Sequence, residues 1–170
     1  MKAITIKEPW AMMIALGEKK NETRSWRTNY RGWIAIHAAK SMVGSRLEND
    51  THTLADQLLG DQEMPLGAIV AIAKLTDCIE ITKEYTESLT LQERTFGYYK
   101  PGYFAWTLED VCRIDTPIKY KGQQGLFNID ERILQRAITE EGFDKMRQAG
   151  ITTLKEAKRC AHEIARGGKA

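Results

Sequence analysis

Short strand-like segments dominate the first 130 residues, and their order along the chain constrains the fold more than any other feature. In the clearest of them, Trp33, Ala35 and His37 alternate with Ile34 and its neighbours, which is the two-residue period of a strand. The few helical segments do not alternate regularly with the strands, which argues against a doubly wound parallel sheet. The sequence therefore predicts an α+β fold, a small and mainly antiparallel β-barrel decorated by helices, with strands at 2–7, 21–25, 33–38, 68–75, 103–108, 118–120 and 127–129.

Helical patterns separate some of these strands. Pro9 suits the first position of a helix, and Gly17 suits its end. Residues 41–60 predict a second helix, and the polar stretch 82–97 predicts short helical turns. These segments supply the helical decoration of the barrel.

The tail after residue 130 differs in kind, because its patterns are helical throughout. Its helices carry an apolar side that a lone helical hairpin buries poorly, so we expect them to dock on the barrel or on a second copy of the chain. The sequence thus divides into a barrel domain, 1–130, and a helical carboxyl-terminal extension, 131–170, with helices expected over 131–138, 140–148 and 153–166.

Composition limits the classes of protein to which the chain belongs. Its 170 residues are 42% hydrophobic and 28% charged, which excludes a disordered chain, and no apolar run approaches the roughly 18 residues that span a bilayer. The first residues hold too short an apolar stretch for a secretory signal, so we expect a cytoplasmic protein without a membrane partner. The 3 cysteines are widely spaced and the histidines number only 3, so neither a metal site nor a cofactor is expected.

The formal net charge of +2 conceals one strongly basic stretch. Between residues 19 and 40, the only acidic residue is Glu22, against the six basic residues Lys19, Lys20, Arg24, Arg27, Arg31 and Lys40. Such a stretch attracts a phosphate backbone locally, although the whole protein is nearly neutral. A nucleic acid is therefore an expected partner.

Three charged residues in this stretch are spaced to converge. A helix ends at Gly17, Lys19 lies in the following turn, and Glu22 and Arg24 lie two residues apart on one face of the strand 21–25. The arginine suits a phosphate or carboxylate, and the carboxylate accepts from a base amino group or orients the lysine. The alternative interpretation is an ion pair between Glu22 and Arg24 that only stabilises the fold.

Aromatic residues are interleaved with the same charges. Trp26 and Tyr30 stand among Arg24, Arg27 and Arg31, and stacking surfaces beside cations are what a single-stranded nucleic acid needs. We expect Trp26 and Tyr30 to stack on bases and the three arginines to hold phosphates. Packing within the fold is the alternative for these aromatic side chains.

Six ordered segments of the chain carry a family resemblance. The pattern begins with a strand and a Pro-Trp-led helix, continues with Gly-x-Lys-x-x-Glu-x-Arg, and comprises residues 4–10, 17–24, 33–38, 65–71, 104–109 and 117–127. On these segments residues 1–130 resemble the ASCH (activating signal cointegrator homology) family, whose members have a PUA-like β-barrel. The resemblance does not extend to the tail.

The resemblance implies a cleft that binds RNA or a nucleoside-like small molecule, lined by Lys19, Glu22 and Arg24. Some small ASCH-like proteins hydrolyse 4-acetylcytidine with a lysine and a threonine of this motif and a more distant glutamate, and others are linked to RNA cleavage. Here Lys19 matches the lysine, Glu22 replaces the threonine, and Glu87 or Glu93 is a candidate for the distant glutamate.

Three hypotheses follow for the function. The first is a nucleic-acid-binding protein, with RNA preferred, and the second is an amidohydrolase or ribonuclease in which Lys19 and Glu22 are catalytic. The third is an interaction protein that acts through its helical tail. Because the Glu22 carboxylate stabilises an ammonium group, we expect Lys19 to stay protonated, and this favours binding over catalysis.

Overall fold

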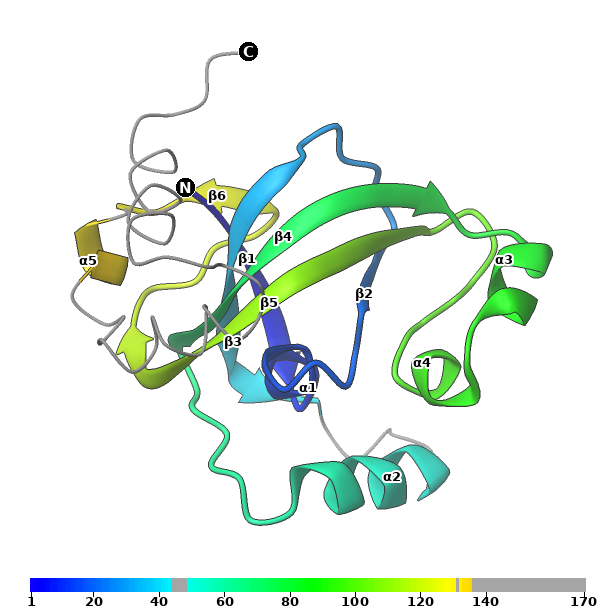
Figure 1. Ribbon diagram of the computed structural model, residues 1–170, viewed down its shortest axis with the longest axis horizontal. Helices are drawn as coiled ribbons and strands as arrows, with labels where there is room; N and C mark the ends of the chain where they lie inside the picture. Colours follow the sequence, from blue (N-terminus) through cyan, green and yellow to red (C-terminus); the bar gives the residue numbers. More distant parts are fainter. Residues whose placement is uncertain (44–48, 131, 136–170) are drawn as a thin grey trace.

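The computed structural model describes residues 1–43, 49–130 and 132–135, and Figure 1 shows the arrangement of its elements. The predicted strands near the amino terminus and the short helical turns within 82–97 are confirmed. The elements follow in the order β1 (Lys2–Glu8), α1 (Trp10–Ala15), β2 (Asn21–Arg24), β3 (Gly32–Met42), α2 (Asn49–Leu59), β4 (Ala68–Glu80), α3 (Lys83–Ser88), α4 (Leu91–Thr95), β5 (Phe104–Lys119), β6 (Leu126–Asn128) and α5 (Arg132–Gln135).

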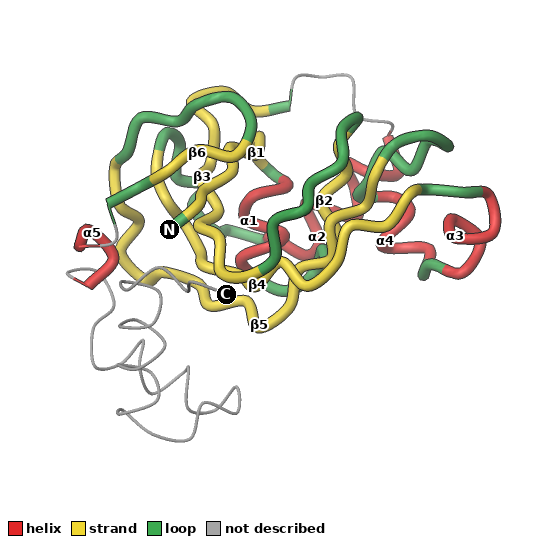
Figure 2. The backbone as a smooth tube through the Cα atoms, turned by 90° about the horizontal axis from the view of Figure 1, so that it is seen from above, coloured by secondary structure: helices red, strands yellow, loops and turns green. Residues whose placement is uncertain are grey.

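The strands form one six-stranded sheet in the order β2-β5-β4-β3-β1-β6. Neighbouring strands are antiparallel except β1 and β3, which run parallel with Ile4 opposite Ile36. The long strands β4 and β5 curl together, and α1 packs against both of them and against β1 and β3 (Figures 1 and 2). The α+β fold with a mainly antiparallel sheet is thus confirmed, but the edge strands β2 and β6 are not paired with each other, so the sheet is not closed.

The structure corrects the predicted boundaries of two segments. The expected strands 103–108 and 118–120 are the two ends of a single strand, β5. Register shifts against β4 accommodate the polar middle of this strand, and Asp110 has a positive φ of 49° at one of them. The expected helix 41–60 begins only at Asn49, because Ser41 and Met42 still belong to β3.

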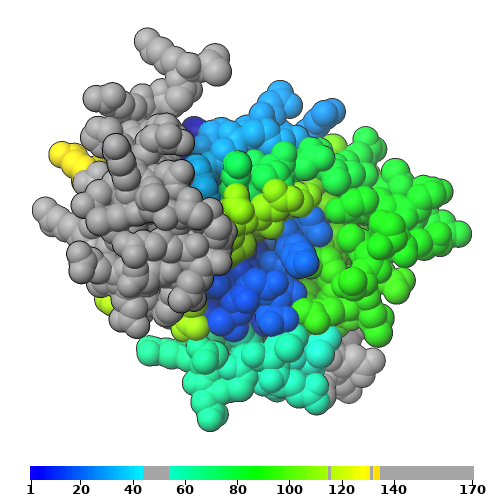
Figure 3. Space-filling model, viewed as in Figure 1, coloured from blue at the N-terminus to red at the C-terminus, as the bar shows by residue number. Residues whose placement is uncertain are grey.

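Two apolar clusters cover the two faces of the curved sheet. One encloses α1, whose residues Ala11–Ala15 are all buried against Ile4 and Ile36. In Figure 3 the blue amino-terminal residues accordingly lie between α2 in cyan and the green segment that contains α3 and α4. The other cluster includes Ile69, Ile72 and Phe127. The strand isoleucines of both clusters are buried, namely Ile4, Ile6, Ile34, Ile36, Ile69 and Ile72.

Several predictions concern parts of the chain that the structure does not describe. Of the predicted tail helices, only α5 falls within the described residues, and the remainder of 131–170 lies outside them. Docking of the tail, the division at residue 130 and assembly of two copies stay predictions. None of the described helices has the length and apolar character that a membrane span requires, and the cytoplasmic location also stays a prediction.

Glu8 is a buried carboxyl group at the junction of β1 and α1. Its side chain is fully enclosed, and its Oε2 accepts a hydrogen bond of 2.9 Å from the Met12 amide. Its Oε1 has no partner among the described residues. Burial disfavours the charged form and raises the pKa of Glu8 to about 7, against the weaker lowering by the Met12 hydrogen bond. The folded chain therefore binds this proton more tightly than the unfolded chain does.

The raised pKa of Glu8 predicts a stability that falls as pH rises. The contribution is complete below the ordinary pKa of 4.5 and is lost as the pH rises through the folded-state pKa of about 7. Between about pH 5 and about pH 8 we expect the free energy of unfolding to fall by about 2–3 kcal/mol on this account. Glu8→Gln keeps an acceptor for Met12 and should remove that part of the fall in urea unfolding. An identical pH dependence in both proteins would contradict the assignment.

Candidate functional site

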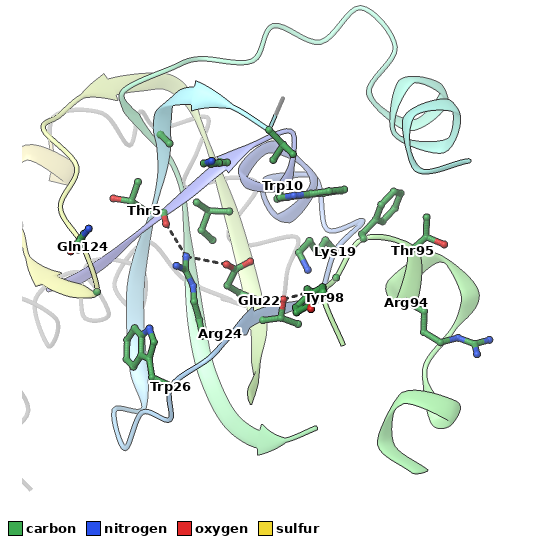
Figure 4. A pocket seen from close by; sticks show the side chains of 18 of the residues that line it. Thr5, Trp10, Lys19, Glu22, Arg24, Trp26, Arg94, Thr95, Tyr98 and Gln124 are labelled. Atoms are coloured by element: carbon green, nitrogen blue, oxygen red, sulfur yellow. Dashed lines mark hydrogen bonds and ion pairs between the residues drawn. The ribbon is translucent and has the colours of Figure 1, made fainter. Parts of the chain in front are cut away.

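A pocket of about 1220 Å³ lies where the sheet fails to close. Only the first half of β1 pairs with β6, so on that side residues 5–7 of β1 have no paired strand and face the edge strand β2, whereas Thr5 and Ile6 pair with β3 on the other side. We call this cavity the seam pocket. Its walls are residues 5–7, residues 22–24 of β2, the segment 94–98 and the loop 123–125, with Trp10 beside them (Figure 4).

An ion pair at the centre of the seam pocket links the two facing strands. Arg24 Nη2 lies 3.0 Å from Glu22 Oε1 and donates a hydrogen bond of 2.8 Å to the Thr5 carbonyl (Figure 4). The alternation of β2 places Glu22 and Arg24 on one face, as the sequence predicts. Among the described residues, Glu22 Oε2 and Arg24 Nη1 make no hydrogen bond, so both remain available to a ligand.

Lys19 reaches the same centre from the turn after α1. Its side chain is only 1% exposed, and its amino group donates to the Asn21 carbonyl. Burial lowers the pKa of Lys19, and Arg24 adds to this, whereas Glu22 and Glu93 act to raise it. Burial, and not the Glu22 carboxylate, is therefore the largest influence on the pKa of Lys19. That Lys19 stays protonated remains a prediction.

The two candidates for a distant glutamate differ sharply. Glu93 in α4 is buried and accepts from the amides of Lys20 at 2.9 Å and Asn21 at 3.0 Å, and from the Tyr99 hydroxyl at 2.6 Å. Glu87 in α3 is exposed on the surface. Glu93 thus fixes the turn that carries Lys19, and its oxygens are occupied by these bonds.

Aromatic side chains form the rim of the seam pocket. Trp26 is 36% exposed and is held edge-to-face against the buried Trp106, with ring centroids 4.5 Å apart. Tyr98 is 60% exposed, and Trp10 packs at a tilt on Phe96. Three flat surfaces of different origin therefore border one cavity, which suits the stacking of planar rings.

The pocket lining is rich in positive charge. Lys7, Lys19, Arg24 and Arg94 line it, against Glu22 as its one acidic side chain among the described residues. Lys7 and Arg94 are exposed and form no ion pair within the described part of the chain. Arg94 extends outward from the far rim in Figure 4. A pocket of this charge attracts anionic ligands.

The loop after β5 forms the last wall and is held by close backbone contacts. Thr5 Oγ1 donates to the Gln123 carbonyl at 3.0 Å, and His37 Nε2 lies 3.1 Å from the Tyr120 carbonyl. A Cβ atom at Gly122 would stand 2.5 Å from the His37 ring, so a larger residue cannot be accommodated there without a shift. His37 is thus a packed residue that anchors the loop, and it is not part of the pocket lining.

Four of the seven predicted site residues meet in the seam pocket: Lys19, Glu22, Arg24 and Trp26. Arg27, Tyr30 and Arg31 lie outside its lining. Arg31 pairs with Asp77 at 3.0 Å, and the Tyr30 hydroxyl donates to the Trp33 carbonyl. A binding role for these three residues stays a prediction, and it requires a track that continues beyond the pocket.

Sequence reasoning missed the pocket residues that come from other segments. Lys7, Trp10, Arg94, Tyr98 and Gln124 all line the cavity but lie outside the predicted site. The Gly-Gln-Gln-Gly run at 122–125 was the strongest available signal, since paired glycines mark a loop in close contact with its neighbours. No cluster of three or more metal-binding side chains is present among the described residues.

Known proteins are similar to this chain in sequence and in fold. The ASCH domain model matches residues 4–118. The crystal structure of ASCH from Zymomonas mobilis is 15% identical, with a TM-score of 0.50, over 81% of this chain and 92% of that one. A tyrosine-to-phenylalanine mutant of the same protein is 16% identical, with a TM-score of 0.50, over 81% and 95%. At these identities the likeness shows the fold alone.

A curated human protein is similar in sequence. Activating signal cointegrator 1 is 25% identical over 151 residues, which are 86% of this chain and 25% of that protein. The chain therefore spans about a quarter of the length of this relative.

Removing the Glu93 carboxylate tests how the Lys19 turn is held. Glu93→Ala leaves two amide groups and the Tyr99 hydroxyl without their acceptor, so we expect the free energy of unfolding to fall by about 3 kcal/mol or more. The matched control is Glu87→Ala, which removes only an exposed pair with Lys83 at 3.8 Å and should change stability by less than about 0.5 kcal/mol. Equal effects in urea unfolding would contradict the anchoring role of Glu93.

Proposed function

This chain belongs to the ASCH domain family, and we propose that it binds a nucleotide of a single-stranded nucleic acid, RNA by preference, in the seam pocket. The observation that carries the proposal is the meeting of exposed aromatic surfaces and unpaired cations around one cavity. The RNA preference follows the resemblance to ASCH proteins.

Stacking provides the part of the affinity that is independent of sequence. Trp26 is held rigid by Trp106, so it presents a fixed ring surface, and Tyr98 and Trp10 offer further rings at the rim. Stacking of a base on an aromatic side chain contributes about 1–3 kcal/mol per base. Single strands expose base faces for such contacts, whereas a duplex does not.

Phosphate contacts provide the salt-dependent part. Lys7 on β1 and Arg94 on α4 stand at different sides of the pocket and have no acidic partner among the described residues. A strand that places its base in the pocket passes its phosphates over this rim. Each phosphate neutralised by such a side chain releases counterions and steepens the dependence of affinity on salt.

Replacing a rim cation tests the proposed phosphate contacts. Lys7→Ala should weaken binding of a single-stranded RNA oligomer and reduce the slope of log affinity against log salt by about 0.7, as loss of one contact to a single strand requires. Lys83→Ala on α3 removes an exposed cation away from the pocket and should leave the slope unchanged. Arg31→Ala tests whether the track extends beyond the pocket. An unchanged slope in Lys7→Ala would count against the proposal.

A second candidate function is hydrolysis of an acylated nucleoside, because one observation favours it. The buried Lys19 amine has a lowered pKa and lines the pocket, and a neutral amine acts as a general base or a nucleophile. In the deacylation of 4-acetylcytidine, water adds to the acetyl carbonyl, the amide C–N bond breaks, and acetate and cytidine leave. Glu22 opposes this chemistry, since it stabilises the charged form of Lys19.

Incubation with 4-acetylcytidine decides between the two candidates. If Lys19 is catalytic, chromatography should show deacylation by the unaltered protein and none by Lys19→Ala. The deacylation rate should rise with pH through the pKa of Lys19, which should lie below the usual lysine value of about 10.4. Lys20→Ala is the matched control, because Lys20 is exposed and does not line the pocket. Absence of turnover in the unaltered protein would reject the hydrolase.

A further inference from the structure

We propose that the seam pocket selects bases with an imide edge, uracil or thymine, through the side chains of Lys19, Glu22 and Arg24. The inference rests on the proposed function, since it specifies which base a bound strand places in the pocket. It concerns the polar centre of the pocket and not its aromatic rim, which stacks on any base.

The three side chains present their polar groups in a fixed order. Figure 4 shows the Glu22 carboxylate between the Arg24 guanidinium on one side and the Lys19 amine on the other. Glu22 Oε1 is engaged by Arg24 Nη2, which leaves Oε2 as an acceptor without a partner among the described residues. Arg24 Nη1 and the N–H groups of Lys19 that do not bind Asn21 are donors. Arg24, Glu22 and Lys19 therefore present to a ligand, in this order, a donor, an acceptor and a donor.

Only one natural base edge is complementary to that order. Uracil and thymine present the O4 acceptor, the N3–H donor and the O2 acceptor in sequence. Cytosine presents a donor followed by two acceptors, and guanine presents an acceptor followed by two donors. Adenine presents a donor and an acceptor only. Every base except uracil and thymine thus places at least one donor against a donor of the pocket, or one acceptor against an acceptor. Such a mismatch leaves polar groups unpaired in a buried site, which is unfavourable.

The order is held in place before a ligand arrives. Arg24 is tied to the Thr5 carbonyl at 2.8 Å, and its ion pair restrains Glu22 in turn. Lys19 is enclosed, and the turn that carries it is fixed by the hydrogen bonds of Glu93. The amine of Lys19 donates whether it is protonated or neutral, so its lowered pKa does not disturb the pattern. Polar groups that cannot reorient discriminate between ligands more strongly than mobile ones.

Binding of homopolymeric oligonucleotides by the unaltered chain tests the inference. With oligomers of about six nucleotides we expect oligouridylate and oligothymidylate to bind about tenfold or more tightly than oligocytidylate and oligoadenylate in fluorescence anisotropy. An oligouridylate methylated at N3 lacks the central donor but keeps its phosphates and ring faces, and it should lose the same tenfold. This probe requires no change to the protein.

Substitution of the central acceptor provides the second measurement. Glu22→Gln retains the shape of the side chain but adds donors, so the preference for uracil over cytosine should shrink to about threefold or less while binding itself persists. Glu87→Gln is the matched control on the exposed surface of α3 and should retain the full preference.

The outcomes separate this inference from the function on which it rests. Equal affinity for all oligomers, or tighter binding of oligocytidylate, would overturn the inference and leave nucleic-acid binding intact. Undiminished binding of the N3-methylated oligomer would do the same. Absence of binding to every oligomer would overturn the proposed function together with the inference.

Discussion

The hydrogen bond from the Arg24 guanidinium to the Thr5 carbonyl spans the gap on which the site depends. No backbone pairing joins β1 to β2 in the described part of the chain, so a side chain links the two strands instead. Direct pairing of these strands would bring them to about 4.8 Å, the spacing of a sheet, and would leave no pocket between them. The Arg24 side chain spans a longer distance between the strands than a backbone hydrogen bond does. Its charge is balanced by Glu22, whose Oε1 lies 3.0 Å from Arg24 Nη2. Arg24 thus bridges the open seam with a side chain where no backbone pairing joins the two strands.

The polar groups around the seam are buried at a cost that the rest of the fold offsets. Lys19 and Glu93 are buried, and an isolated buried charge is strongly unfavourable. Here each finds partners, since Lys19 donates to Asn21 and Glu93 accepts three hydrogen bonds. Titratable groups whose pKa is shifted by burial, as that of Lys19 is, are concentrated at functional sites. The rule that charged side chains stay on the surface is therefore broken at the seam pocket, where the proposed function requires buried polar groups.

The sequence alone predicts the part of the site that lies within one short segment of the chain. Alternation in 21–25 places Glu22 beside Arg24 because a strand repeats every two residues. The approach of Lys7 and Tyr98 depends instead on the parallel pairing of β1 with β3 and on the packing of α4, and neither follows from local pattern. Arg31 was grouped with Arg24 by proximity in sequence. The loop between β2 and β3 carries it away to Asp77 on β4, a contact between distant parts of the chain.

The identity of the residue at position 22 sets the proposed recognition of a base against the alternative proposal of catalysis. A carboxylate there supplies the acceptor between two donors, and the same charge raises the pKa of Lys19 against the lowering by burial. A threonine, which the resemblance places here in the small ASCH-like proteins that hydrolyse 4-acetylcytidine, has a weaker acceptor and no charge to hold an ammonium. The lysine would then lose its proton more readily, and the donor-acceptor-donor edge would lose its fixed centre. Glu22 therefore favours the proposed reading of a base over the alternative chemistry of the amine, because both proposals depend on this one side chain.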